Sequence, residues 1–528
     1  MFAPLKTIDK SVKQALSKTN CKCIKKQDPC DCTNDVEKDV EHTSEKHHQN
    51  KKKIDECCVK NITSFKTPLD AYNNSPKEEL LYTVALPVDL NKPDHLVTID
   101  VNPKSPTYCK VIGQLPMPHV GDELHHTGWN ACISCKGDQS LKHKYLILPS
   151  MVSGNIYVVD VLTDPKNPKL HKEISGELIK EKVSGSYPHT SHCLPNGDVM
   201  ISLMGGKNKD GRGGFLILDG ETFDIKGRWE KAGDTTQFGY DFWYQPNFNV
   251  MVSSEFGEPQ AFMEGFNPTH VAKRYGDSLT FWNWNEKTVK NKVCLGQNGL
   301  IPLECRFAHD PKKNYGFVGV ALSTTVVRFY QESQSDKFTT EQVISIQPIR
   351  VKNWALEQMP GLITDILISL DDRFLYITLW LHGSVQQYNI ENPRNPKLVG
   401  EIYLGGSLRK DGNVIPLDEN GNERPDLLKE IPTVKGHKLQ GAPQMIQLSR
   451  DGQRLYVSSS LLRPWDKQFY PEMAEKGGQI IQLDVNTKEG GLSLNKDFYV
   501  NFEDQPFGPA VAHEMRYPGG DCSSDIWV

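Results

Sequence analysis

Residues 187–200 of the chain read Y-P-H-T-S-H-C-L-P-N-G-D-V-M. The dipeptide Asn196-Gly197 stands between two β-prone runs, and it is a strong hairpin signal because Asn and Gly tolerate positive φ. The stretch therefore predicts a strand, a tight turn and a second, apolar strand. Two histidines, His189 and His192, lie on the first strand of this hairpin.

The same pattern recurs along the chain. A turn rich in Asp, Asn, Gly or Pro precedes an apolar β run at residues 193–202, 244–253, 309–318, 369–378 and 449–458. Further strands and turns follow, so the chain contains four-strand units at irregular intervals of about 50 to 80 residues. Such a repeat is typical of propeller blades.

The leading strands of these units predict how the fold closes. They are expected near residues 126, 189, 240, 305, 364, 444 and 512–517. No room for three more strands follows the last one, so its partners are expected at 81–86, 96–101 and 109–115. We therefore predict an all-β fold, a seven-bladed β-propeller over residues 66–528, closed by pairing of N- and C-terminal strands. This closure removes an exposed sheet edge, and one α/β domain or two β-sandwiches fit the strand spacing less well.

Residues 1–65 differ in composition from the rest of the chain. They are rich in Lys and Cys and poor in large apolar residues, so they cannot bury enough surface to offset the entropy of ordering. We interpret them as a disordered extension that precedes the propeller domain. The pairs Cys21/Cys23 and Cys30/Cys32 suit a soft metal ion, and the alternative is a solvated tail with incidental thiols.

Composition limits the classes of partner. The 528 residues are 38% hydrophobic and 24% charged, with a net charge of −5, as in an ordinary globular protein. No sustained basic stripe with aromatic residues is present in the propeller, so no nucleic-acid partner is expected. No apolar run reaches membrane-spanning length and no signal-peptide core is visible. We expect a cytosolic location, with the nucleus or peripheral membrane association as alternatives. The 13 cysteines are an odd number, which favours thiols or metal ligands over a disulfide framework.

The leading strands carry a set of polar residues at equivalent positions. In a propeller these strands line the central channel, and the aligned positions are His126, His189, Tyr240 or Asp241, Glu304 or Cys305, Thr364 or Asp365, Gln444 and His513. Imidazoles that converge from several strands can hold Cu, Fe or Zn. The alternative is a hydrated channel whose histidines bind water and backbone. His125 and His192 are further candidate ligands, unless strand alternation turns them away from the channel.

A C-x-x-C motif is the second chemical feature. Cys132 and Cys135 have the spacing of redox pairs and zinc half-sites, but neither a βα unit nor a second such motif accompanies them. Cys135 is expected at the turn after the leading strand, where Lys136 or a nearby imidazolium would favour its thiolate. The alternative is an ordinary thiol.

Long motifs of the chain resemble one known family. These motifs are H-H-T-G-W-N-A-C-I-S-C-K-G (125–137), H-T-S-H-C-L (189–194), G-Y-D-F-W-Y-Q-P (239–246), P-G-L-I-T-D-I-L-I-S-L-D-D-R-F-L-Y (360–376) and H-E-M-R-Y-P-G-G-D-C-S-S-D-I-W (513–527). They resemble the selenium-binding protein family, which is also known as methanethiol oxidase. The likeness covers roughly residues 68–528.

The resemblance implies an activity, a cofactor and site residues. It implies oxidation of methanethiol, a small thiol, with O2 and water to formaldehyde, hydrogen sulfide and hydrogen peroxide. It implies copper, with the metal ligands drawn from His125, His126, His189, His192 and His513, and selenium bound covalently at Cys135. We expect Cys135 and Glu304 to be catalytic, with Glu304 as a candidate base and Asp241 and Asp365 as alternatives to it. The competing functions are a non-enzymatic selenium-binding scaffold in redox signalling or intra-Golgi protein transport, and a zinc or iron lyase or dioxygenase.

Overall fold

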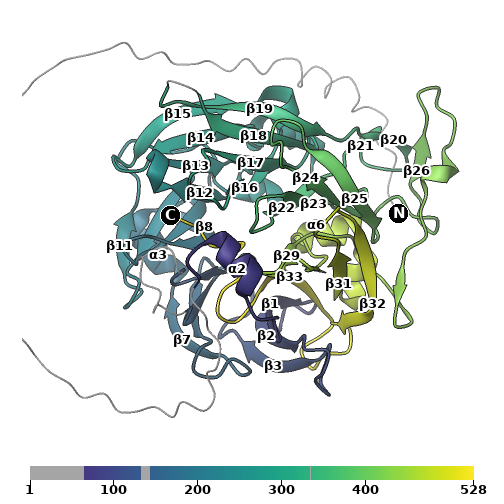
Figure 1. The fold of residues 1–528 in the computed structure, drawn as a ribbon, viewed down its shortest axis with the longest axis horizontal. Coiled ribbons are helices and arrows are strands. Elements are labelled where there is room, and N and C mark those ends of the chain that lie inside the picture. The colour runs from purple at the N-terminus through teal and green to yellow at the C-terminus, as the bar shows by residue number, and fades with distance from the viewer. Residues whose placement is uncertain (1–64, 133–142, 333–334) are drawn as a thin grey trace, which may run out of the picture.

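The computed structural model describes residues 65–132, 143–332 and 335–528. Almost all of the predicted disordered extension lies outside these residues. Cys135, between the first two described ranges, also lies outside them. Within them, seven antiparallel sheets have four strands each, which equals the number of blades expected from the repeats. Figure 1 shows the sheets arranged around a common centre. The prediction of an all-β propeller with many short antiparallel sheets is confirmed.

The four-stranded sheets follow one another along the chain. Three of them are β4 (Gly128–Trp129), β5 (Tyr145–Pro149), β6 (Ile156–Asp160) and β7 (Lys169–Ile174); β8 (Gly185–Cys193), β9 (Val199–Gly206), β10 (Gly214–Leu218) and β11 (Ile225–Arg228); and β12 (Phe242–Gln245), β13 (Val250–Ser254), β14 (Ser278–Asn283) and β15 (Thr288–Cys294). Three more are β16 (Pro302–Phe307), β17 (Tyr315–Val320), β18 (Thr325–Gln331) and β19 (Phe338–Ser345); β22 (Ile363–Ile368), β23 (Phe374–Leu379), β24 (Ser384–Asn389) and β25 (Lys397–Tyr403); and β29 (Ile446–Leu448), β30 (Arg454–Val457), β31 (Gln479–Val485) and β32 (Leu492–Asn501).

The seventh sheet joins the two ends of the described chain. It contains β1 (Leu80–Pro87), β2 (His95–Asp100), β3 (Val111–Pro116) and, from the C-terminal end, β33 (Ala510–Arg516). β33 pairs with β1 in antiparallel register, with Tyr82 opposite Arg516. The predicted closure is thus confirmed, and it removes the exposed edges of both terminal strands.

The leading strands lie next to one another at the centre of the fold. β4 contacts β8, β12 contacts β16, and β16, β22, β29 and β33 contact one another in that order. Residues far apart in sequence are therefore brought together around one axis. This arrangement positions the candidate site.

The hairpin at residues 187–200 forms as predicted from β8 and β9. Gly197 has a φ of 89°, which the Asn-Gly turn requires, and the Leu194 N–H donates to the Asp198 carbonyl at 2.7 Å. The pairing of β8 with β9 shifts register between Pro188 and Ser191. This irregularity lies between His189 and His192, and such shifts re-aim side chains relative to simple alternation.

Helical insertions cover one end of the channel. α4 (Pro259–Phe262) and α5 (Val271–Arg274) lie between β13 and β14, and α6 (Arg463–Phe469) and α7 (Pro471–Lys476) lie between β30 and β31. The two insertions meet where the Trp465 indole N–H donates to the Phe262 carbonyl at 2.9 Å. Phe256 stacks on Phe262 with a centroid distance of 4.7 Å, so this cover is apolar.

The C-terminal segment after β33 is buried in the fold. The Trp129 indole N–H donates to Asp521 at 3.2 Å, and the Gln245 side-chain amide donates to the Trp527 carbonyl at 3.0 Å. Residues 520–527 are buried, so the segment covers inner strands of several sheets.

The remaining elements lie outside the four-stranded sheets. They are the helices α2 (Pro68–Asn74) and α3 (Gly176–Val183), the 3-10 turns η1 (Pro246–Phe248), η2 (Pro268–His270), η3 (Gly296–Gly299) and η4 (Pro425–Leu427), and the strands β20 (Ile349–Lys352), β21 (Gln358–Met359), β26 (Ile415–Leu417), β27 (Thr433–Val434) and β28 (His437–Lys438). In the part of the chain that the structure describes, every helix is too short or too polar to cross a bilayer.

Candidate metal centre

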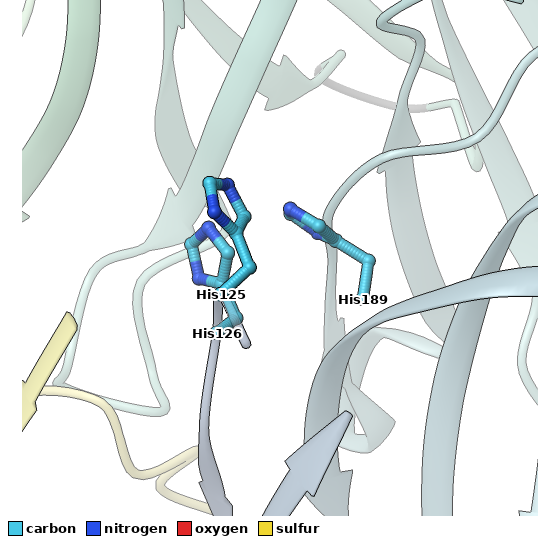
Figure 2. Close-up of side chains that lie close together, drawn as sticks. All are labelled: His125, His126 and His189. Carbon is cyan, nitrogen blue, oxygen red and sulfur yellow. The ribbon is translucent and has the colours of Figure 1, made fainter. Parts of the chain in front are cut away.

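Four histidines meet at the centre of the propeller. His125 and His126 precede β4, His189 lies on β8 and His513 on β33. Candidate ligand nitrogens of His125, His126 and His189 lie within 4.8 Å of one another (Figure 2). The His513 ring stacks on the His125 ring with a centroid distance of 3.5 Å. None of the four is more than 3% exposed, so the group is closed to bulk solvent.

The imidazoles of His125, His189 and His513 are held neutral. Burial, followed by the neighbouring histidines, lowers the pKa of His125 and His189 well below the usual value. Burial and then His126 lower the pKa of His513 to about 3. A neutral imidazole keeps a lone pair on one ring nitrogen, and this is the form that binds metal ions.

Neighbouring groups leave one nitrogen of each ring available. The His513 Nδ1–H donates to the Ser460 carbonyl at 2.7 Å, and His189 Nδ1 lies 3.0 Å from the Thr190 hydroxyl. The Nε2 atoms of both rings are buried and have no hydrogen-bond partner among the described residues. A hydrogen bond at Nδ1 that fixes the free Nε2 is typical of metal-ligating histidine.

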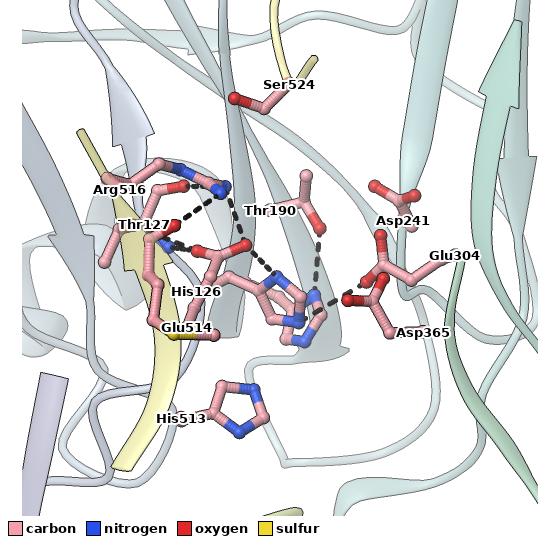
Figure 3. A network of polar contacts seen from close by, with 12 residues as sticks. His126, Thr127, Thr190, Asp241, Glu304, Asp365, His513, Glu514, Arg516 and Ser524 are labelled. Carbon is pink, nitrogen blue, oxygen red and sulfur yellow. Dashed lines mark hydrogen bonds and ion pairs between the residues drawn. The ribbon is translucent and has the colours of Figure 1, made fainter. Parts of the chain in front are cut away.

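Glu514 orients the third imidazole. His126 Nδ1 lies 3.0 Å from Glu514 Oε1, and Glu514 also accepts hydrogen bonds from the Thr127 backbone N–H and hydroxyl (Figure 3). Burial alone would raise the pKa of Glu514, but Arg516, 2.6 Å away, and His126 hold it well below the usual value. An ionised Glu514 accepts the Nδ1 proton of His126, which places the lone pair on Nε2.

A set of carboxyl groups lies on the other side of His126. Glu304 Oε1 is 3.5 Å from His126 Nε2, and Glu304 Oε2 accepts a hydrogen bond from Arg306 at 3.0 Å. Burial and then Asp241 raise the pKa of Glu304 well above its usual value. Burial raises the pKa of Asp365 to about 7. One oxygen each of Glu304, Asp241 and Asp365 has no hydrogen-bond partner among the described residues. The centre therefore combines metal-type donors with a group able to exchange protons.

The channel positions predicted from the leading strands are all buried. They are His126, His189, Tyr240, Asp241, Glu304, Cys305, Thr364, Asp365, Gln444 and His513. The ring of Tyr240 lies 4.2 Å from that of His189, and both amide atoms of Gln444 are buried without a hydrogen-bond partner in the described chain.

Of the other predicted site residues, His192 is placed differently. The His192 ring packs edge-on against Phe242 and Trp243, at 5.1 and 5.0 Å, and lies outside the group that holds His189. Burial, followed by Arg306 and Arg516, lowers the pKa of His192 to about 3. Cys135 lies outside the described residues, and its partner in the motif, Cys132, is buried with its sulfur 2.7 Å from that of Cys193.

Sequence reasoning missed Glu514, Arg306 and Arg516. A signal for them exists, because both β16 and β33 contain Glu-x-Arg, as Glu304-Cys305-Arg306 and Glu514-Met515-Arg516. Residues two apart on a strand lie on one face, so each pair forms a local ion pair. The repetition of this pattern in two leading strands indicates two salt bridges on the channel, and both flank His126.

The donor set fits a transition-metal ion. Buried imidazoles with unpartnered Nε2 atoms are ligands for Cu, Fe or Zn, and the hydrogen bonds at Nδ1 supply the orientation that such a site needs. His125, His126 and His189 are the residues that would hold the ion, with His513 beside them.

Comparison with known proteins places this centre in a family. The family model described as "56kDa selenium binding protein (SBP56)" matches residues 58–528. The chain belongs to this selenium-binding protein family. Among its relatives, Selenium-binding protein 2 of Arabidopsis thaliana is 52% identical, and the alignment covers 89% of this chain and 96% of that one. Methanethiol oxidase of Xenopus laevis is 54% identical, with 88% and 98% covered.

A solved structure of the family supports the fold. The crystal structure of a hypothetical selenium-binding protein from Sulfolobus tokodaii is 36% identical to this chain, with a TM-score of 0.78. It covers 89% of this chain and 100% of its own length. The selenium-binding protein fold therefore extends over nearly all of the described residues.

Proposed function

We propose that the protein is a methanethiol oxidase, which converts methanethiol, O2 and water to formaldehyde, hydrogen sulfide and hydrogen peroxide. The buried group of His125, His126 and His189 is the observation that carries this proposal, because it offers a redox-metal site inside a closed channel. The relative of that name in Xenopus laevis, 54% identical over 468 residues, supports the choice of substrate.

The proposed cofactor is copper. His125, His126 and His189 would hold it, with His513 as a further ligand or as the ring that packs against His125. Bound copper would supply one-electron chemistry, and it accepts imidazole and sulfur ligands together. Zinc accepts the same ligands but does not change its oxidation state. In the overall reaction the methyl carbon loses two electrons and O2 gains two.

Protein groups around the site would orient the histidines and transfer protons. Glu514 fixes the orientation and tautomer of His126, and the Ser460 carbonyl does the same for His513. Glu304, whose Oε1 faces His126 Nε2 at 3.5 Å, is the proposed proton acceptor. It would take a proton from the water that attacks the oxidised carbon, a step in which the C–S bond breaks and sulfide leaves.

Selenium binding is the competing function. Relatives named selenium-binding protein match as well as those named methanethiol oxidase, at 52% identity for the Arabidopsis thaliana protein. In that case selenium bound covalently at Cys135, rather than a metal at the histidines, would carry the function, and the propeller would act as a scaffold. A cytosolic location and a part in sulfur metabolism belong to the methanethiol oxidase proposal.

Metal analysis combined with an activity assay separates the two functions. Purified full-length protein is loaded with copper and assayed for sulfide and peroxide from methanethiol, beside His189→Ala and the control His119→Ala. His119 is a surface residue paired with Glu173, so its replacement leaves the centre intact. The oxidase is supported if wild type and His119→Ala bind stoichiometric copper and turn over methanethiol, while His189→Ala does neither. Protein that binds no copper and forms no sulfide, while selenium attaches at Cys135, supports the scaffold.

A further inference from the structure

The histidine group separates two cavities of opposite character. One, which we call the apolar chamber, is lined by side chains that include Met151, Met204, Leu303 and Ala321, and by the rings of His125 and His189. The other, the polar chamber, is lined by residues that include His126, His192, Glu304, Arg306, Glu514 and Arg516. The two linings share no residue, so His126 faces one chamber while His125 and His189 face the other.

The apolar chamber has the size of a very small ligand. Its cavity volume is about 20 Å³, on the scale on which a single buried water needs roughly 10–15 Å³. It therefore has room for a molecule of about two heavy atoms. Its lining offers almost nothing to a polar group apart from the two imidazoles, Tyr240 and Thr364, so a substituent that must hydrogen-bond would be left unpaired there.

The walls of this chamber are anchored. The Ala321 N–H donates to the Ile301 carbonyl at 2.8 Å, and Trp465, which closes the chamber from α6, is tied to Phe262 through its indole N–H. Leu303 is 4% exposed and lies on β16, one residue from Glu304. Close packing around anchored walls resists expansion, so the volume of the chamber limits what enters it.

We propose that the apolar chamber binds the alkyl group of a short-chain thiol, with the sulfur toward His125 and His189, and that Ala321 and Leu303 set the upper size of that group. The inference rests on the proposed methanethiol oxidase function and adds the site that selects the substrate. A methyl group and one sulfur fill the available space, while each additional methylene must displace a wall. The charged side chains of the polar chamber lie beyond His126, where they leave the alkyl group undisturbed.

Two chamber variants and one matched control test the inference. Ala321→Val adds two carbons to the chamber, and Leu303→Val removes one carbon from its wall. Leu367→Val makes the same change as Leu303→Val at a leucine that is 2% exposed, lies on β22 and lines neither chamber. Circular dichroism and thermal melting of each copper-loaded protein identify any variant that does not fold.

The first readout is selectivity in turnover. The ratio of kcat/KM for ethanethiol to kcat/KM for methanethiol is measured for each folded variant. One methylene in an apolar pocket changes such ratios by about 10- to 200-fold. Ala321→Val is expected to lower the ratio at least 10-fold, Leu303→Val to raise it several-fold, and Leu367→Val to leave it unchanged. Equal ratios in wild type, Ala321→Val and Leu303→Val would overturn the inference.

The second readout is binding without turnover. Isothermal titration of the copper-loaded proteins with methanethiol and ethanethiol in the absence of O2 gives the two dissociation constants directly. If Ala321→Val and Leu303→Val change the dissociation constants as expected but no sulfide forms in air, the chamber inference stands and the oxidase proposal fails. If methanethiol is oxidised but neither binding nor selectivity responds to Ala321→Val and Leu303→Val, the oxidase proposal stands and the chamber inference fails.

Discussion

His126 Nδ1 lies 3.0 Å from Glu514 Oε1, in the middle of the propeller and 388 residues away along the chain. Arg516 keeps Glu514 ionised, and Glu514 in turn keeps the proton of His126 on Nδ1. The Nε2 lone pair is thereby directed away from Glu514 and toward the side on which Glu304 lies. A carboxylate on β33 thus determines which nitrogen of a central histidine, in the segment before β4, is available for a metal ion.

Replacing Glu514 tests this relationship. In Glu514→Gln the side chain keeps its shape but loses its charge, so it no longer fixes the His126 tautomer. We expect copper affinity to fall about 10- to 100-fold, as for other partners of metal-binding histidines. A competition titration with a copper chelator measures the loss. Glu258→Gln, which breaks a similar carboxylate–Arg274 pair away from the channel, is the control. Equal affinity in both variants would contradict the assigned role.

The histidines should separate into ligands and a non-ligand. Alanine at His125, His126 or His189 removes one nitrogen from the group and is expected to abolish stoichiometric copper binding. His192→Ala is expected to retain it, because the His192 ring packs on Phe242 and Trp243 instead. Elemental analysis of the four variants after dialysis measures the copper that each one retains. Copper lost from His192→Ala but kept by His189→Ala would refute the assignment.

Glu304 should affect turnover more than metal binding. Glu304→Gln keeps the hydrogen bond acceptor for Arg306 but cannot accept a proton, so we expect kcat for methanethiol to drop by about 10²-fold or more. Copper stoichiometry and anaerobic methanethiol binding should stay within a few-fold of wild type. A variant with full kcat would remove Glu304 from the reaction, and one without copper would make it a metal-site residue.

The contribution of three buried carboxyl groups to stability should decrease as pH rises from about 4 to 7. Burial raises the pKa of Asp466 to about 7, above the unfolded value of about 4. Burial likewise raises the pKa values of Asp94 and Glu255 to about 7. In this window each of these three carboxyls binds more protons in the folded protein than in the unfolded chain, so its contribution to the free energy of unfolding falls with increasing pH. The buried histidines act in the opposite direction, because their lowered pKa values make the unfolded chain bind more protons. Each group contributes at most about 1.4 kcal/mol per pH unit.

Asp466→Asn isolates one of these groups. Its carboxyl accepts hydrogen bonds from the Ser460 hydroxyl and the Leu461 N–H, and an amide oxygen can replace one acceptor. In urea unfolding at several pH values, the free energy of unfolding of wild type relative to Asp466→Asn should decrease as pH rises from 4 to 7. Asp219→Asn, at an exposed turn whose carboxyl has a lowered pKa because of the Thr222 backbone N–H, should give a curve parallel to that of wild type between pH 4 and 7. Parallel curves for wild type and Asp466→Asn would contradict the prediction.

Much of the fold follows from local patterns in the chain. The turn at Asn196-Gly197 and its counterparts predict short antiparallel strands, because turn residues and strand alternation act over a few positions. The same repeat predicts the pairing of β33 with β1 and the burial of His189 and His513 on leading strands and of His126 just before one. Element boundaries differ by one or two residues, as at β3, which begins at Val111 rather than at 109.

The chemistry of the centre depends on contacts between residues that lie far apart in the sequence. Sequence spacing leaves open whether His125 and His192 face the channel, because the irregular pairing of β8 between Pro188 and Ser191 breaks simple alternation. Glu514 reaches His126 only because closure of the propeller brings the two ends of the chain together. The separation of an apolar from a polar chamber likewise depends on side chains from several sheets and from the helical cover. The repeating strands and their histidines are therefore encoded locally, whereas ligand choice, proton position and chamber size arise from contacts between residues hundreds of positions apart, which no local pattern specifies.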